Sequence, residues 1–283
     1  MTDPFHVLRR PLVRLAPDPA FAARLRERIH HALTEGVRMT AQSQLAATEG
    51  DVAYFSLQLP DAARARQFYR AVLGWRFGAG DEPGHSAQVE GQSLPLGIWN
   101  GPPSPGIRTP GVLLVHRVAD IVASIAAVRS LGGTASPPHQ EPYGVVADCL
   151  DDQGNGFSLL ELPPDAARPP VNGARAGDVA YITISPGDDQ RASQFYGTLF
   201  GWRSAPGNVP GGRQVDGPAP MIGLWGGTGR QAVTLMYLVD DITTAAARVR
   251  DAGGTATQPE PQPYGVTSQC TDNQEMTFTL GQL

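Results

Sequence analysis

The side chains that could carry nucleophilic chemistry are few in this chain of 283 residues. All 22 basic residues are arginines, which excludes Schiff-base chemistry and lysine general bases. The two cysteines, Cys149 and Cys270, hold equivalent places in an internal repeat, so we expect them in separate cores and not in a disulfide. Because no histidine accompanies both at a matching place, we interpret them as small buried hydrophobic residues.

Histidines are the other side chains that could bind a metal or accept a proton near neutral pH. None of the six has a histidine at the corresponding place of the other copy, so they do not define one site shared by both copies. They are His6, His30 and His31 before the repeat, and His85, His116 and His139 within its first copy.

An internal duplication organises the chain. Residues 50–75 read GDVAYFSLQLPDAARARQFYRAVLGW, and residues 177–202 read GDVAYITISPGDDQRASQFYGTLFGW. Further on, the tetrapeptide Pro-Tyr-Gly-Val recurs at 142–145 and 263–266. We therefore predict two homologous domains, 50–163 and 177–283, joined by a proline-rich linker at 164–176 and preceded by a helical extension at 1–49.

Hydrophobic periodicity predicts two β-α-β-β-β cycles in each domain. In the first domain the cycles open with strands at 52–59 and 112–118, followed by helices at 61–73 and 121–131. Asp61 is the expected N-cap of the first helix and Gly74 its end. Before the repeat, Asp18-Pro19 begins an amphipathic helix that could pack on the two domains or form a homodimer, with a membrane-surface role as the minor alternative.

Charge and hydropathy exclude several partners. A net charge of −5 and a pI near 5.7, without a basic stripe, argue against nucleic acid. No apolar run reaches the roughly 18 residues that a membrane span needs. Arginines at 9, 10 and 14 and a proline at 11 interrupt any secretory hydrophobic segment, so we expect a cytoplasmic protein.

The repeated motifs resemble those of the vicinal oxygen chelate superfamily, which includes glyoxalase I, extradiol dioxygenases, bleomycin-resistance proteins and methylmalonyl-CoA epimerase. The resemblance implies an α+β fold of two tandem domains, each made of two βαβββ units that form a cup-shaped mixed sheet. The residues that carry it are Asp61, Phe68-Tyr69, Leu73-Gly74-Trp75, Val118-x-Asp120-Ile121 and Asp152-Gln153-Gly154-Asn155-x-Phe157. Their counterparts are Asp188, Phe195-Tyr196, Phe200-Gly201-Trp202, Val239-Asp240-Asp241-Ile242 and a degraded final turn, Asp272-Asn273-Gln274-Glu275.

The superfamily's enzymes usually hold a divalent metal with a His on the first strand, a His or Glu on the strand that opens the second cycle, and a Glu on the last strand. None of the six corresponding residues here is a His or a carboxylate, so we expect no metal and no cofactor. Glu161 and His116 have the wrong strand parity to replace them, and we assign His116 a structural or surface role. The six positions are Tyr54, Leu113 and Ser158, and Tyr181, Thr234 and Thr279.

Strand alternation leaves aromatic and neutral polar side chains on the inner face of each cup. Such a lining suits a flat, weakly polar organic ligand, although the same aromatics could instead fill a collapsed core. We expect the first cup to be the better site because it keeps the turn glycine and has a longer 80–95 segment. The predicted lining is Tyr54, Ser56, Gln58, Trp99, Leu113 and Ser158, and Tyr181, Thr183, Trp225, Thr234 and Thr279.

Three functions agree with these features. The first is a metal-free small-molecule-binding protein of the glyoxalase or bleomycin-resistance type that sequesters an aromatic or natural-product ligand. The second is a lyase, isomerase or oxygenase that uses Tyr54 or Tyr181 as an acid, or a metal site built from other residues. The third is a structural pair of domains without a ligand. The sequence leaves open whether the protein catalyses a reaction.

Overall fold

The computed structural model describes residues 47–78, 86–141, 143–163, 165–207, 211–226 and 231–283. The helix expected after Asp18-Pro19 and the homodimer through it lie outside these residues and stay predictions. None of the described helices has the length and apolar character that a membrane crossing requires.

The first domain contains the two predicted cycles. Its first cycle consists of β1 (Val52–Gln58), α2 (Ala62–Leu73), β2 (Arg76–Phe77), β3 (Ser86–Glu90) and β4 (Leu96–Trp99). Its second cycle consists of β5 (Gly111–Val118), α3 (Ile121–Ser130), β6 (Thr134–Ala135), β7 (His139–Glu141), β8 (Gly144–Leu150) and β9 (Gly156–Glu161).

The second domain repeats this order. Its first cycle is β10 (Val179–Ser185), α4 (Asp189–Phe200), β11 (Arg203–Pro206), β12 (Gly212–Asp216) and β13 (Met221–Trp225). Its second cycle is β14 (Ala232–Leu238), α5 (Ile242–Asp251), β15 (Thr255–Ala256), β16 (Glu260–Gln262), β17 (Gly265–Thr271) and β18 (Thr277–Gln282).

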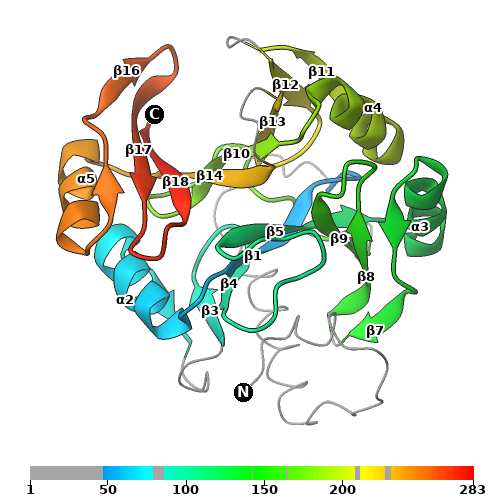
Figure 1. Ribbon diagram of the computed structural model, residues 1–283, viewed down its shortest axis with the longest axis horizontal. Coiled ribbons are helices and arrows are strands. Elements are labelled where there is room, and N and C mark those ends of the chain that lie inside the picture. Colours follow the sequence, from blue (N-terminus) through cyan, green and yellow to red (C-terminus); the bar gives the residue numbers. More distant parts are fainter. Residues whose placement is uncertain (1–46, 79–85, 142, 164, 208–210, 227–230) are drawn as a thin grey trace.

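Each domain forms one mixed sheet with its helices on the outside (Figure 1). The strand order of the first sheet is β2-β3-β4-β1-β5-β9-β8-β6, and the second sheet has the same order from β11 to β15. Antiparallel pairing of β1 with β5 joins the two cycles, whereas β1 pairs with β4, and β5 with β9, in parallel. This confirms the predicted cups and adds a ninth strand to each, because β7 and β16 form hairpins with β8 and β17.

Helix α2 shows how local sequence creates the fold. The Asp61 side chain accepts hydrogen bonds from the backbone of Ala63 and Arg64, and the helix ends at Gly74, whose φ of 69° favours glycine. The buried residues Ala65, Phe68, Tyr69 and Val72 follow an i, i+3, i+4, i+7 spacing and form one apolar stripe.

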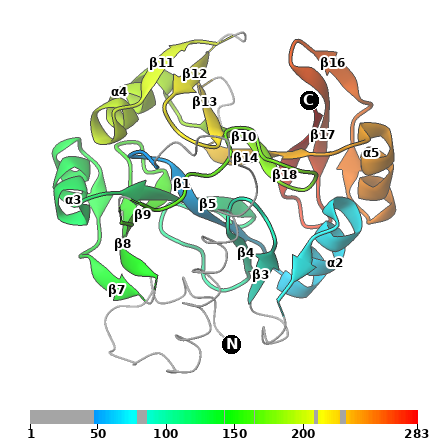
Figure 2. The same cartoon turned by 180° about the vertical axis from the view of Figure 1, so that it is seen from behind.

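That stripe packs against the opposite domain. Phe68 and Tyr69 make ring contacts with Phe278 of β18, with centroids 6.1 and 6.2 Å apart. In the same way Tyr196 of α4 contacts Phe157 of β9 at 5.9 Å. Figure 1 and Figure 2 both show α2 beside α5 and α4 beside α3. The two domains therefore share one hydrophobic core.

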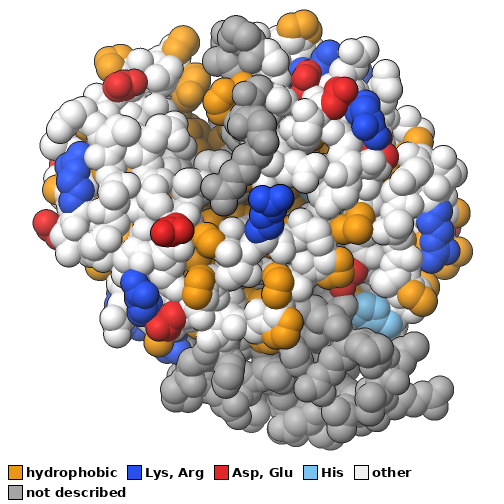
Figure 3. Space-filling view, in the orientation of Figure 1, with side chains coloured by type: hydrophobic (Ala, Val, Ile, Leu, Met, Phe, Trp, Pro, Cys, Tyr) orange, Lys and Arg blue, Asp and Glu red, His pale blue; other side chains and the backbone are white. Residues whose placement is uncertain are grey.

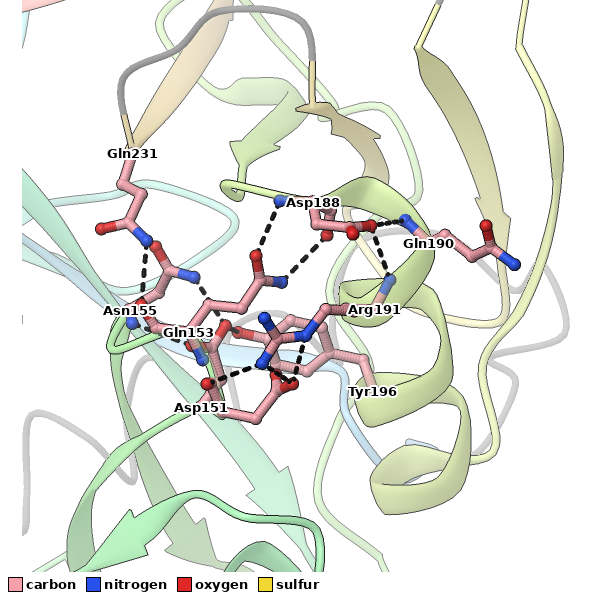
Figure 4. Close-up of polar contacts among 9 residues, drawn as sticks. Asp151, Gln153, Asn155, Asp188, Gln190, Arg191, Tyr196 and Gln231 are labelled. Carbon is pink, nitrogen blue, oxygen red and sulfur yellow. Dashed lines mark hydrogen bonds and ion pairs between the residues drawn. The ribbon is translucent and has the colours of Figure 1, made fainter.

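Polar contacts fix the first helix of each domain on the final turn of the other domain, and Figure 4 shows those of α4. The side-chain amide of Gln153 accepts from the Asp188 backbone N–H at 2.7 Å and donates to the Asp188 carbonyl at 2.9 Å. Arg191 donates to the carboxylate of Asp152 at 2.8 Å, and the Tyr196 hydroxyl donates to Asp151 at 3.1 Å. Asp152, Gln153, Asp188 and Tyr196 are motif residues that the sequence analysis assigned only to the fold, whereas it did not assign Asp151 and Arg191.

The equivalent contacts of the second domain's final turn show that this turn is intact. Gln274 makes the same paired hydrogen bonds with Asp61, at 2.7 and 2.9 Å, and Tyr69 donates to Asp272 at 3.2 Å. The expectation of a degraded turn was wrong. Glu275 adopts a φ of 72°, close to the 82° of Gly154 in the first domain, and so keeps the turn without a glycine.

Both cysteines are free and buried, which confirms their interpretation as small hydrophobic residues. Burial raises the pKa of the Cys149 thiol to about 12. His116 has the predicted structural role and is buried, not on the surface: its Nδ1 lies 2.9 Å from the Gly50 carbonyl, and its ring contacts Phe200 and Trp202. Burial lowers the pKa of His116 to about 4.

Replacing Glu275 with glycine should stabilise the protein. A non-glycine residue in the left-handed region costs about 1–2 kcal/mol, which glycine avoids. Glycine also gives the unfolded chain more entropy, which offsets about 0.4–1 kcal/mol of this gain. We expect Glu275→Gly to raise the unfolding free energy by about 0.5–1 kcal/mol in urea titrations. Gly154→Ala is the matched control and should lower it by a similar amount; a destabilised Glu275→Gly variant would contradict the assignment of strain.

His116 should make the fold sensitive to acid. Its pKa falls from 6.5 to about 4 in the folded protein, so the unfolded chain binds the proton first as pH decreases. Stability is complete above about pH 6.5 and should decrease by up to about 3 kcal/mol as pH falls towards 4. We expect His116→Phe to flatten this part of the profile, measured as unfolding free energy against pH; an unchanged slope would show that other groups cause it.

Candidate functional site

The two faces of each sheet have separate roles. On β1, Phe55 and Leu57 are fully buried in the core shared with the helices. Tyr54 alternates to the concave face and packs in a small separate cluster with Val115 and Leu160. The parity predicted for the cup lining therefore agrees with the packing of the sheet.

The register places the expected metal positions next to one another. Tyr54 lies opposite Val115, which lies opposite Ser158, and Leu113 lies one step along the cup opposite Ser56. The second sheet gives the row Tyr181, Met236 and Thr279, with Thr234 opposite Thr183.

These residues do not fit the divalent metal that the fold family implies. Phenol, hydroxyl, thioether and alkyl side chains replace the imidazole and carboxylate ligands of such centres. Within the described part of the chain, no three His, Cys, Asp or Glu side chains converge in a way that could hold a metal ion.

A tyrosine, a glycine and a glutamine form the same arrangement in both cups. The Tyr181 hydroxyl donates to Gln214 at 3.2 Å, and a Cβ at Gly223 would collide with that hydroxyl. In the first cup Gln88 donates to the Tyr54 hydroxyl at 3.2 Å across a corresponding glycine at 97. The tyrosine ring thus lies directly over the neighbouring strand in each cup.

Sequence reasoning missed these glutamines and glycines. The signal was present, because Gln88-Val89-Glu90 and Gln214-Val215-Asp216 match at an offset of 126, as do the Gly-x-Trp segments 97–99 and 223–225. This offset of 126 differs by one residue from the offset of 127 between residues 50–75 and 177–202, and the match is hidden for that reason.

In the first cup, two predicted ligand-binding residues hold a loop in place. Gln58 donates to the Ser104 hydroxyl at 2.7 Å and accepts from the Ser104 backbone at 2.9 Å. Trp99 lies opposite Gln58, is only 3% exposed, and donates to the Pro102 carbonyl at 2.9 Å. Both side chains therefore stabilise the 102–104 segment in this structure.

The remaining lining of the first cup is also buried. Ser158 donates to Asp148 at 2.7 Å, and Leu113 and Ser56 are each 1% exposed. The Ser56 hydroxyl has no hydrogen-bond partner among the described residues. Asp148 is a carboxylate on the concave face that the sequence analysis did not assign.

The second cup is more open. Tyr181, Thr183 and Thr234 are half-buried, whereas Trp225 is 41% exposed and Tyr264 is 57% exposed. Thr279 is nearly buried and donates to Gln269 at 3.3 Å. Figure 3 shows a hollow beside the β16–β17 wall, with hydrophobic side chains at its border.

This order of exposure is the reverse of our expectation that the first cup is the better ligand site. One argument for that expectation, the missing turn glycine at 275, fails because the turn is intact in both domains. The other rested on the 80–95 segment, of which residues 80–85 lie outside the described part of the chain.

Tyr264 belongs to the recurring Pro-Tyr-Gly-Val motif and lies near Tyr181. Burial raises the pKa of Tyr181, and the nearby Tyr264 raises it further, so the Tyr181 phenol is neutral at physiological pH. The second cup thus offers two aromatic hydroxyls and an exposed indole, without a charged group at the tyrosine.

Comparison with known proteins agrees with this architecture. Residues 54–160 match the glyoxalase-like domain family. The anthracycline biosynthesis protein DauV of Streptomyces sp. (strain C5) is 31% identical over 129 residues, which are 42% of this chain and 44% of DauV. The match thus spans less than half of that relative.

Solved structures show the same fold over both domains. A catechol 2,3-dioxygenase superposes with a TM-score of 0.61 and 14% identity, over 84% of this chain and 89% of the other. The Mn(II)-bound glyoxalase from Novosphingobium aromaticivorans gives 0.62 and 15%, over 84% and 83%. The first domain is thus glyoxalase-like, and the chain has the tandem fold of the vicinal oxygen chelate superfamily, which confirms the resemblance seen in the sequence.

The contact between Tyr181 and Gly223 can be tested by a double-mutant cycle. Gly223→Ala should displace the tyrosine hydroxyl from Gln214 and lower the unfolding free energy by about 1–2 kcal/mol. The loss should be smaller in a Tyr181→Phe background, because the colliding oxygen is then absent. Urea unfolding of the four proteins measures the coupling, and strictly additive effects would show that the ring does not lie over Gly223.

Proposed function

We propose that this protein binds a small, flat, largely uncharged organic molecule on the concave face of its second domain, without a metal at the superfamily's usual positions. The observation that carries the proposal is the exposure of Trp225 and Tyr264 around an open cup whose inner positions are Tyr181, Thr234 and Thr279. Exposed apolar surface that gathers around a groove is typical of a site that binds a ligand or a partner.

The chemistry of the lining supports a neutral aromatic ligand. Indole and phenol rings stack on flat molecules, and the threonine hydroxyls supply a few hydrogen bonds that fix orientation. Met236, which lies between Tyr181 and Thr279, adds an adaptable apolar surface at the floor. The partial similarity to DauV, a protein of anthracycline biosynthesis, favours a natural product as the ligand class.

The donor set supports metal independence. The family's metal enzymes draw their catalytic power from a metal bound by imidazole and carboxylate groups, and this chain places tyrosine, leucine, serine and threonine at those positions. An enzyme that uses the neutral Tyr181 phenol as an acid is the alternative, and product formation with the bound molecule would favour it over simple sequestration.

Binding can be tested by thermal shift. We screen planar polycyclic natural products, including an anthracycline, with and without EDTA, because a ligand of the native state raises the melting temperature by mass action. We expect the same shift in both conditions and less than one transition metal per chain by elemental analysis. A shift that EDTA abolishes would contradict metal independence.

The equivalent tryptophans give a matched pair of variants. Trp225→Ala should weaken binding at least about tenfold, because the stacking surface is lost. Trp99→Phe, at the corresponding place in the buried first cup, should leave affinity unchanged. The opposite ranking would move the site back to the first cup.

A further inference from the structure

A cavity of about 270 Å³ lies at the junction of the two domains. It is bordered by the C-terminal end of α2, by the chain that leads into β10, and by the end of β14 with the first turns of α5. Figure 1 and Figure 2 both show α2 beside α5 on the outside of the sheets. None of the side chains assigned to the two cups borders this cavity, so it is a separate place on the molecule.

The duplication provides an equivalent place in the first domain. In both domains a glycine donates its backbone N–H to a carbonyl near the end of the strand that opens the second cycle. Gly50 donates to Arg117 at 2.9 Å, and Gly177 donates to Leu238 at 2.8 Å. The residue that precedes each glycine therefore has the same position in both domains, and the two residues can be compared directly.

A carboxylate occupies this position in the first domain. Glu49 Oε1 accepts a hydrogen bond from the Ala119 backbone N–H at 2.8 Å, directly before the N-cap of α3. The positive end of the helix dipole favours a negative charge there. The corresponding residues of the second domain are Ala176 and Asp240, and both border the cavity. The second domain therefore keeps the backbone donor but lacks the carboxylate.

Two further substitutions change the charge and the size of the same place. Arg248 borders the cavity, whereas the equivalent residue of α3 is Ala127. The first copy has Phe200 packed so closely on Gly50 that a Cβ at this glycine would collide with the ring, and the second copy has the smaller Leu73 instead. The cavity thus gains a guanidinium and loses an aromatic ring, which leaves room for an anion with an apolar part.

The acidic residues at the border of the cavity are compatible with an anion. Asp241 accepts hydrogen bonds from the Thr244 backbone N–H at 3.1 Å and from its hydroxyl at 2.6 Å. Its counterpart Asp120 caps α3 in the same way, although the Glu49 carboxylate is bound at the neighbouring residue. Asp240 is exposed, so water and salt screen its charge.

We propose that the domain junction binds a small monocarboxylate with an aliphatic tail, and that its carboxylate takes the place that Glu49 holds in the first copy. The carboxylate accepts a hydrogen bond from the Asp240 backbone N–H and pairs with Arg248. The aliphatic tail lies against Val72 and Leu73 at the end of α2. This site does not depend on the ligand proposed for the second cup.

A pair of small probes tests the carboxylate directly. 4-Methylvalerate and 4-methylvaleramide have the same aliphatic tail, but only the first carries a negative charge. Titrations of the full chain followed by NMR should show 4-methylvalerate binding at least about tenfold more tightly than the amide, the range expected for hydrogen bonds to a charged group. Equal affinities, or no binding of either probe, would overturn the proposal.

The first copy supplies two matched substitutions. Ala176→Glu introduces the side chain of Glu49, which should occupy the site and abolish binding of 4-methylvalerate. Arg248→Ala introduces the residue found at the equivalent position 127 and should weaken binding at least about threefold, and it decides alone if Ala176→Glu does not fold. Trp225→Ala should leave binding intact, which separates this site from the second cup. Unchanged binding in either folded junction variant, or its loss in Trp225→Ala, would refute the assignment.

Discussion

The packing of each domain's first helix against the other domain is the interaction on which the rest of the structure depends. Each of α2 and α4 covers part of the partner domain's core, and its N-terminus is held by a glutamine from the final turn of that domain. Buried hydrogen bonds from Tyr69 to Asp272 and from Tyr196 to Asp151 fix the position of each helix relative to the other domain. Because burial alone disfavours a carboxylate, each aspartate also accepts backbone N–H bonds within its own turn.

This arrangement explains why the two cups open away from each other. The described helices and the shared core occupy the convex faces, so no described helix covers a concave face (Figure 1). It also explains why the second final turn keeps its shape with Glu275 in place of a glycine. Gln274 and Asp272 of that turn anchor α2, and losing their hydrogen bonds would cost more than one strained backbone conformation.

The sequence was sufficient for the architecture because both copies carry the same periodicity, caps and aromatic positions. Local rules determine the first helix and its buried face from Asp61, Gly74 and the Phe68-Tyr69 pair. The second copy carries the same residue types at the equivalent positions and so supports each assignment. The short strands β7 and β16 could not be predicted, since three residues carry too little periodicity and their pairing depends on the hairpin. Domain boundaries and the ligand-binding role of the lining residues stay predictions.

The site was harder to predict because accessibility is a property of the whole molecule. Trp99 and Trp225 are equivalent in sequence, yet one donates to a loop carbonyl in a buried cup and the other lies at an open rim. Alternation on a strand gives the face of a side chain but not what covers that face. The contact between His139 and Glu141 was missed for a related reason, because only the folded β7–β8 hairpin brings the two side chains within 3.7 Å of each other.

The duplication allows residues that the fold requires to be separated from residues that it does not. Where both copies keep a residue, as with the tyrosines over glycine at 97 and 223, the shared fold accounts for it. Where the copies differ on a concave face, the fold does not require the difference. The cause of the difference then lies in what each cup contacts. The first cup has buried ionisable groups, and the second has exposed aromatic rings without them. The two copies have thus acquired different linings, with buried ionisable groups in the first cup and exposed aromatic rings in the second.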